Sequence, residues 1–256
     1  SPIFETDVPL EDAGLPTDLQ AFAGSTLPLT AAPRASALRF RSDFSLASLE
    51  SVSRVHSRPY VNFVKHLADE LEPGESVPFT PRVQREGFGI LTPRAKPEKL
   101  CDTAFCQATL RAALRACGAA TAAVDQVLTP GLGRTAFCVV RPPGHHAGVS
   151  GLPNGIVPQV PDGDTSEAPS CGVCIFNTVC VAAAHAIKAF HARRVAIVDV
   201  DAHHGNGTEE IVDLYNRTNE SLGRAPQIFL ASTHLYNRAF YPGTGKRDEM
   251  DSCCMN

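Results

Sequence analysis

Two pairs of adjacent histidines lie in the second half of the 256-residue chain. His145 and His146 follow a Pro-Pro-Gly turn, and His203 and His204 come shortly after Asp201. Asp201 and His203 are two residues apart, and in extended chain side chains at that spacing point to the same side. Carboxylate and imidazole groups together suit a divalent metal such as Zn²⁺. The spacing therefore predicts two ligands of one metal ion.

The first histidine pair is suited to proton transfer beside such a metal. The prolines before it restrict the backbone and hold both rings in one place. A general base next to a metal-bound water, whose pKa falls from about 15.7 to about 7 on Zn²⁺, could generate hydroxide for attack on an amide. An oriented imidazole needs a partner on its second nitrogen, and Asp199 and Asn206 are candidates. An acidic partner would keep one ring charged, and an amide partner would leave the other free to cycle.

Each motif taken alone also has an ordinary explanation. An isolated Asp-x-His is more often a solvated loop, and tandem histidines can be plain surface residues. The position of both motifs at the ends of predicted strands favours a site instead. A catalytic zinc site has typically three protein ligands and an open position. Only two ligands are visible here, so the third must come from elsewhere.

The chain from residue 136 onward alternates strands and helices. Each predicted strand is a continuous apolar run, as expected when helices cover both faces of a parallel sheet. The functional crevice of such a sheet lies past the carboxyl ends of its strands, and all three predicted strands end in polar residues. The predicted strands cover 136–140, 194–200 and 227–231, and the predicted helices run from near Ser57 to before Pro73 and over 103–128, 178–190 and 208–215.

The composition excludes several classes of protein. A content of 43% hydrophobic and 20% charged residues is globular, and a net charge of -4 with scattered basic residues gives no field for nucleic acid. No apolar stretch approaches the roughly 20 residues that span a bilayer, and no signal sequence opens the chain. Nine cysteines, an odd number, indicate a reducing compartment. We expect an N-terminal arm over 1–50, a loop over 75–99 and a surface insertion over 148–169.

Three sequence runs carry a family resemblance. Arg141-Pro-Pro-Gly-His-His-Ala147, Asp199-Val-Asp-Ala-His-His-Gly-Asn-Gly-Thr208 and Phe240-Tyr-Pro-Gly-Thr-Gly245 are similar to the signature runs of the zinc-dependent histone deacetylases, closer to class II than to class I. The resemblance implies an arginase-like three-layer α/β/α fold with a mostly parallel sheet, incomplete at the C-terminal side in this chain. It makes 51–256 the N-terminal part of a catalytic domain that hydrolyses N-acetyl-lysine to lysine and acetate.

The resemblance also implies a role for individual residues. Asp201 and His203 would bind zinc, and His146 would be the likelier general base beside His145. Asp199 would be the partner of His145 and Asn206 the partner of His146. The remaining implied residues are Asp199 and Ser232 at a structural K⁺ site, Asp102 as a rim carboxylate that holds the substrate backbone, and Gly172, Val173, Phe240 and Tyr241 around the acyl-lysine.

The chain departs from the family pattern in three places. Val173 stands where the family usually has an aromatic residue, which predicts a wider tunnel and acceptance of bulkier acyl groups. Cys171-Gly-Val-Cys174 could be a redox or zinc pair, but without a second pair we expect reduced thiols in the pocket wall. The family's third zinc ligand, an Asp, and its transition-state Tyr would lie beyond residue 256. Because losing an oxyanion donor costs about 10²–10³ in rate, this segment alone is not expected to be a competent enzyme.

The expected partners follow from the same resemblance. They are acetylated lysine in histone tails or other proteins, the remaining part of the catalytic domain and corepressor-type proteins, but neither nucleic acid nor membrane. The expected location is the nucleus, the cytoplasm or both. An acetylpolyamine hydrolase, another acyl-lysine amidohydrolase and an inactive deacetylase-like scaffold are the alternatives.

Overall fold

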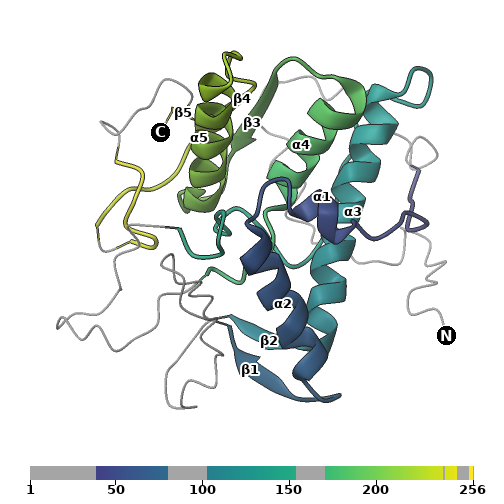
Figure 1. The fold of residues 1–256 in the computed structure, drawn as a ribbon, viewed down its shortest axis with the longest axis vertical. Helices are drawn as coiled ribbons and strands as arrows, with labels where there is room; N and C mark the ends of the chain where they lie inside the picture. Colours follow the sequence, from purple (N-terminus) through teal and green to yellow (C-terminus); the bar gives the residue numbers. More distant parts are fainter. Residues whose placement is uncertain (1–38, 80–102, 154–170, 239, 247–253, 256) are drawn as a thin grey trace, which may run out of the picture. The chain divides into compact units, whose positions relative to one another are not determined.

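The computed structural model describes residues 39–79, 103–153, 171–238, 240–246 and 254–255. The chain divides into two compact units, Ser1–Asp43 and Phe44–Asn256, and every described helix and strand belongs to the second (Figure 1). Asp102, most of the predicted arm and most of the predicted insertion lie outside the described residues. No helix in the described ranges is both long and apolar enough to cross a bilayer.

A parallel sheet forms the C-terminal part of the second unit. It contains β3 (Val195–Asp199), β4 (Ile228–Ser232) and β5 (Cys254–Met255), in that order, and β3 and β4 end in register at Asp199 and Ser232. α4 (Thr178–Phe190) precedes β3, and α5 (Asn206–Ser221) connects β3 to β4 (Figure 1). The predicted α/β fold with a parallel sheet is therefore confirmed, and the carboxyl ends of β3 and β4 lie side by side.

The two faces of this sheet differ in burial. Ile197 of β3 and Leu230 of β4 are buried, and α4 contacts β3 while α5 contacts β4. Val198 of β3 is 66% exposed and Phe229 of β4 is 38% exposed. Within the described residues helices thus cover one face, whereas the apolar strand sequences led us to expect both. An apolar run indicates that a strand is buried somewhere, but it does not say which chain segment covers it.

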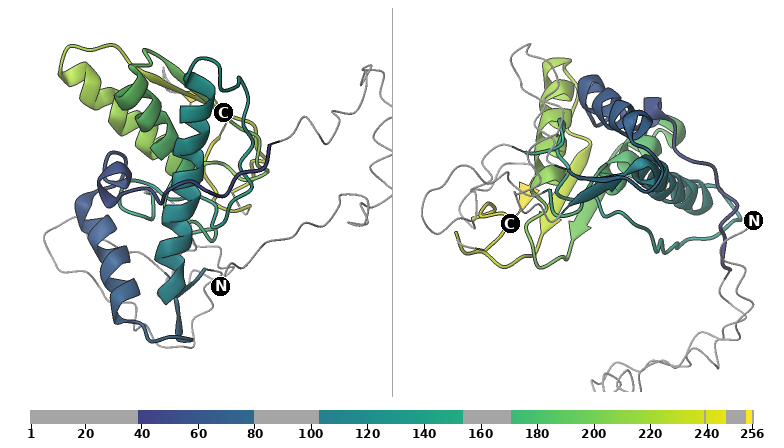
Figure 2. Two further views of the ribbon diagram at one scale, coloured as in Figure 1. Left: turned by 90° about the vertical axis from the view of Figure 1, so that its right-hand side faces the viewer. Right: turned by 90° about the horizontal axis from the view of Figure 1, so that it is seen from below.

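Helices and a small antiparallel pair make up the rest of the unit. α1 (Leu49–Val52) and α2 (Arg58–Glu70) are followed by β1 (Ser76–Pro78), which pairs with β2 (Ala104–Cys106) just before α3 (Gln107–Leu128). α3 packs against both α2 and α4, and Figure 2 shows this part of the fold from two further directions. Aromatic side chains fill the core between these elements: Tyr60, Phe63, Phe79, Phe105 and Phe176.

Local signals explain where two of the helices begin and end. The Ser57 side chain accepts a hydrogen bond from the Tyr60 N–H and caps α2, which ends shortly before Pro73 as predicted. The Asn177 side chain accepts from the Cys180 N–H and caps α4, whose bounds are those predicted. α4 ends at His191, whose φ of 56° is left-handed. Side-chain caps thus fix the starts of α2 and α4.

Several predicted bounds are wrong. Residues 136–140 form no strand in the structure, and Phe137 and Val139 are 91% and 88% exposed, because no described strand pairs with this run. α3 begins at Gln107, four residues later than expected, since 104–106 pairs with β1 inside the predicted loop. α5 extends to Ser221 because its sequence contains no proline or glycine after Gly207 to stop it before that residue.

Candidate active site

The loop that carries the first histidine pair is fixed to the starts of α4 and α5. The Asn177 amide donates to the Ala147 carbonyl oxygen at 3.1 Å, and the Thr208 N–H donates to the His145 carbonyl oxygen at 3.0 Å. A Cβ at Gly144 would lie 2.5 Å from the Phe176 carbonyl oxygen, so only glycine allows this approach. These contacts bring residues 144–147 next to the end of β3.

The two histidines of this loop have partners of different charge. His145 Nδ1 lies 2.9 Å from Asp199 Oδ2, and His146 Nδ1 lies 2.8 Å from Asn206 Oδ1. The two rings are adjacent, with centroids 4.0 Å apart. The hydrogen bonds between these pairs, implied by the family resemblance, are therefore present, and one imidazole faces a carboxylate while the other faces an amide.

The environment sets the protonation of this group. Burial, with the charge of His145 as a second cause, lowers the pKa of His146 to about 4. Burial alone would raise the pKa of Asp199, but hydrogen bonds from His145 and from the Asp201 N–H hold that pKa below its ordinary value. At neutral pH His146 is therefore uncharged and Asp199 is ionised. Because the Asn206 oxygen accepts the Nδ1 proton, Nε2 of His146 carries the lone pair of a base.

Asp201 and His203 present two possible metal ligands. Asp201 Oδ1 lies 3.1 Å from His203 Nδ1, and two tetrahedral ligands about 2.0–2.1 Å from zinc lie roughly 3.3 Å apart. The His203 N–H also donates to Asp201 Oδ1 at 2.8 Å, which fixes the carboxylate. Burial alone would raise the pKa of Asp201, but this hydrogen bond and the charge of His145 lower it. The pair fits two corners of a zinc site, and no third His, Cys, Asp or Glu joins it among the residues described.

The predicted acyl-lysine residues surround the histidines. The Phe240 ring stacks on His203 with centroids 4.9 Å apart and an interplanar angle of 2°. The Tyr241 ring meets His146 edge-on at 4.8 Å. Gly172 has a φ of 53°, and a Cβ there would overlap the His146 ring. The structure thus brings Gly172, Phe240 and Tyr241 to the histidines, Val173 follows Gly172 in the chain and bonds to Thr103, and Asp102 lies outside the described range.

Two further parts of the site are the predicted cation-site residue Ser232 and the two cysteines of the pocket wall. Ser232 is buried beside Asp199 in the sheet register, and its Oγ lies 2.8 Å from His234 Nδ1. Cys171 and Cys174 are buried and joined by a turn in which the Cys174 N–H donates to the Cys171 carbonyl oxygen. Both pack with Ala147 in one small cluster, and their reduced state stays a prediction.

A second imidazole pair behind the site was not given a role by the sequence. The rings of His204 and His234 lie 4.5 Å apart, His204 Nδ1 is 2.9 Å from Thr244 Oγ1, and His234 Nε2 is 2.8 Å from the Gly245 oxygen. A Cβ at Gly245 would overlap both rings. This glycine was therefore the one sequence feature that could have indicated the close contact with the two histidines. Burial, then the charge of His234, lowers the pKa of His204 to about 4. The pair anchors the Phe240–Gly245 turn, whose Phe240 ring stacks on His203.

Comparisons with known proteins agree with this geometry. A family model described as the histone deacetylase domain matches residues 28–255. The crystal structure of the HDA15 HD domain superimposes with a TM-score of 0.59 at 28% identity, covering 84% of this chain and 48% of that one. The likeness therefore extends over most of this chain but about half of the solved domain.

Curated relatives show the same relation. Type-2 histone deacetylase 2 of Dictyostelium discoideum is 36% identical over 194 residues, which are 72% of this chain and 10% of the relative. Histone deacetylase 14, chloroplastic, of Arabidopsis thaliana is 32% identical over 225 residues, 85% of this chain and 41% of the relative. The chain spans less than half the length of these proteins. Because the family model covers most of the chain, the chain belongs to the histone deacetylase family.

Proposed function

We propose that this chain forms the histidine and zinc-ligand part of a zinc-dependent lysine deacetylase. One observation supports the proposal most. Two adjacent imidazoles lie beside the Asp201–His203 pair, and one of them has a carboxylate partner, Asp199, while the other has an amide partner, Asn206. The proposed reaction is hydrolysis of N-acetyl-lysine in histones or other proteins to lysine and acetate. Asp201 and His203 would hold the zinc ion, which when bound would polarise the amide and lower the pKa of water.

The chain's own residues would carry the proton. His146 Nε2 would accept a proton from the attacking water, since its Nδ1 proton is held by Asn206 and its ring is neutral at pH 7. His145, hydrogen-bonded to the ionised Asp199, is the ring with an anionic partner, so it would donate a proton toward the leaving amine. Phe240 and Tyr241 would pack along the aliphatic lysine stem and exclude water.

The remaining assignments complete the proposal. A third zinc ligand and a transition-state tyrosine would come from chain beyond residue 256, and Asp102 would hold the substrate backbone at the rim. A K⁺ ion would lie at Asp199 and Ser232. Corepressor-type proteins and the remaining part of the domain are the proposed partners, in the nucleus or cytoplasm. Relatives named as chloroplastic in Arabidopsis thaliana and Oryza sativa mean that family membership alone does not fix the compartment.

Metal content and turnover measured together test this function. The protein that carries this chain should hold about one zinc ion by atomic emission and release acetate from an acetyl-lysine peptide. Asp201→Ala should lose both, while Asp213→Ala, which removes a surface partner of Arg217 on α5, should keep both. Wild-type protein without zinc and without turnover would instead be an inactive scaffold. Cleavage of acetylpolyamine but not of the peptide would favour a polyamine hydrolase.

A further inference from the structure

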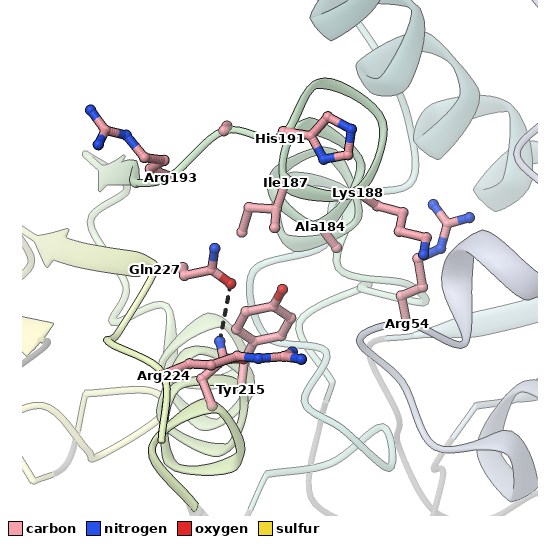
Figure 3. A pocket seen from close by; sticks show the side chains of 11 residues that line it. Arg54, Ala184, Ile187, Lys188, His191, Arg193, Tyr215, Arg224 and Gln227 are labelled. Atoms are coloured by element: carbon pink, nitrogen blue, oxygen red, sulfur yellow. Dashed lines mark hydrogen bonds between the residues drawn. The ribbon is translucent and has the colours of Figure 1, made fainter. Parts of the chain in front are cut away.

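A cavity of about 660 Å³ lies at the end of the sheet opposite the candidate active site (Figure 3). Its lining comes from the C-terminal half of α4, the C-terminal half of α5, the residues before β3 and β4, and Arg54, which follows α1. The catalytic candidates follow the carboxyl ends of these strands, whereas the cavity lies at their amino ends. A molecule bound there would not touch His145, His146, Asp201 or His203.

Positive charge gathers around this cavity. Arg54, Lys188, Arg193 and Arg224 line it together with His191, and no carboxylate does. Within the described ranges, no carboxylate oxygen forms an ion pair with any of these four cations. The four belong to separate segments of a chain whose net charge is -4, so folding creates a local positive site in an acidic protein.

The interior of the cavity offers an aromatic ring and amides. Tyr215 projects between Arg224 and the apolar side chains of Ala184 and Ile187 in Figure 3. Burial raises the pKa of Tyr215, while a hydrogen bond with Asn219 and the charge of Arg224 oppose that rise. Asn219 Nδ2 also donates to Gln227 Oε1 at 3.2 Å. The cavity therefore combines a flat ring, an amide pair and cationic groups at its rim.

The negative ends of the helix dipoles can balance only part of this positive charge. α4 and α5 both end here, and each helix C-terminus is equivalent to roughly -0.5 elementary charge. Two termini supply about -1 against four full positive charges. The dipoles can explain Lys188 in the last turn of α4, but Arg54, which follows α1, remains without a counter-charge in the described residues. An anion would neutralise the excess.

We propose that the cavity binds an organic phosphate, in which a phosphate group is attached to an aromatic body such as a nucleoside. Phosphate oxygens would contact Arg54, Lys188 and Arg224 through charge-assisted hydrogen bonds. The aromatic body would pack on Tyr215 against Ala184 and Ile187. The volume falls in the range of about 300–1,000 Å³ typical of small-molecule sites. This site goes beyond the proposed deacetylase function and does not depend on it.

Calorimetric titration of the whole chain tests the site with three probes. Adenosine 5′-monophosphate should bind saturably at one site, inorganic phosphate about tenfold more weakly, and adenosine without detectable heat. Arg224→Gln and Lys188→Gln should each weaken nucleotide binding by about tenfold or more. Arg217→Gln removes the same charge from α5 outside the cavity and should leave binding within roughly twofold. Higher ionic strength should weaken the wild-type interaction.

Other outcomes would overturn the proposal. These are the absence of saturable nucleotide binding, equal binding by the Arg224→Gln and Arg217→Gln proteins, or adenosine binding as tightly as its monophosphate. If inorganic phosphate bound as tightly as adenosine 5′-monophosphate, the cavity would not recognise the aromatic part of the proposed ligand. Circular dichroism confirms that each variant is folded, and Arg54→Gln replaces any variant that is not.

Discussion

At the scale of single residues, His56 is the histidine whose hydrogen bonds most restrict its protonation. Its Nδ1 lies 2.8 Å from the Gly148 oxygen, and its Nε2 accepts from the Asn177 N–H at 2.8 Å. A protonated ring would have no acceptor left for Asn177. Burial lowers the pKa of His56 from 6.5 to about 4. His56 therefore links the active-site loop to the cap of α4 only in its neutral form.

This predicts a loss of stability in acid. The unfolded chain binds a proton near pH 6.5, whereas folded His56 binds one only near pH 4, so its contribution is complete above 6.5 and is lost as the pH falls to 4. The shift corresponds to about 3 kcal/mol. Urea unfolding across this range should show a steeper acid loss for wild type than for His56→Leu. Equal pH slopes would contradict the assignment, and His66→Ala on the surface should behave as wild type.

Val173 is the residue for which a substrate prediction can be made. It is 37% exposed, has a φ of 54°, and its N–H donates to Thr103 Oγ1 at 2.8 Å. A β-branched residue in the left-handed region is strained, so unbranched side chains fit this backbone at least as well. Because valine is smaller than the aromatic residue usual in the family, we expect it to leave space for the acyl group next to Gly172.

We expect this space to admit acyl groups larger than acetyl. In a panel of acetyl, crotonyl and myristoyl lysine peptides, wild type should cleave more than the acetyl peptide. Val173→Phe should lower kcat/KM for the longer chains by about tenfold or more while acetyl cleavage changes little. Cleavage of acetyl peptide alone by wild type would refute the prediction. Val179→Phe is the matched control, because Val179 in α4 is about as exposed as Val173.

The sequence indicated the partners of the first histidine pair from the motif after β3, but it placed the histidine loop at the end of a strand over 136–140 that the structure lacks. Asp199 and Asn206 flank the Asp201–His203 motif, and the parallel sheet brings them to the histidine loop. The contact of His204 with Thr244 was not predictable, because the Phe240–Gly245 turn returns from a different part of the chain. A short motif shows which side chains can bind a metal or a proton. A contact between residues far apart in the sequence depends on the complete fold.

At the scale of elements, α3 is held by a close backbone approach. Gly118 lies against the extended segment before α1, and a Cβ there would overlap the Ser45 oxygen and lie 3.0 Å from the Ala47 nitrogen. The Ala47 N–H donates to the Leu114 carbonyl oxygen at 2.9 Å. Both contacts are backbone atoms, which cannot rotate away. The glycine is therefore required by packing even though it weakens the helix.

Gly118→Ala should destabilise the protein despite the better helix propensity of alanine. Alanine gains about 1 kcal/mol of propensity, but overpacking against backbone costs roughly 1–3 kcal/mol or more. Thermal unfolding should show a lower midpoint than wild type. Exposed Ala112→Gly on the same helix measures the propensity effect alone. A raised midpoint for Gly118→Ala would show that the segment before α1 does not pack as described.

Helix ends were predictable from caps, but strand pairing was not. Thr178–Phe190 follows from the Asn177 cap and the apolar periodicity. The run 136–140 has the composition of a buried strand, yet it has no partner in the described chain. Composition specifies the preference for a sheet, and only a neighbouring strand converts that preference into structure. Even distribution of basic residues along the sequence likewise concealed their convergence on the cavity at Tyr215.

At the scale of the whole molecule, one edge and one face of the sheet have no cover from the helices and strands that the structure describes. Within the described residues β3 pairs only with β4, and Val198 and Val200 are 66% and 78% exposed. Exposed apolar strands with an open edge are normally covered by another chain segment. The chain also matches 48% of the HDA15 HD domain. Both observations support the proposal that the site is completed by further chain.

In the proposed mechanism His146 acts as the base of an amide-hydrolysing zinc site. The most direct test is acetate release from an acetyl-lysine peptide by the protein that carries this chain. His146→Ala should lower kcat/KM by about 10²–10⁴ with zinc content unchanged. His185→Ala, which removes a hydrogen bond to Asp125 away from the site, should retain activity. Equal activity of the His146→Ala and His185→Ala proteins would show that His146 is not the base.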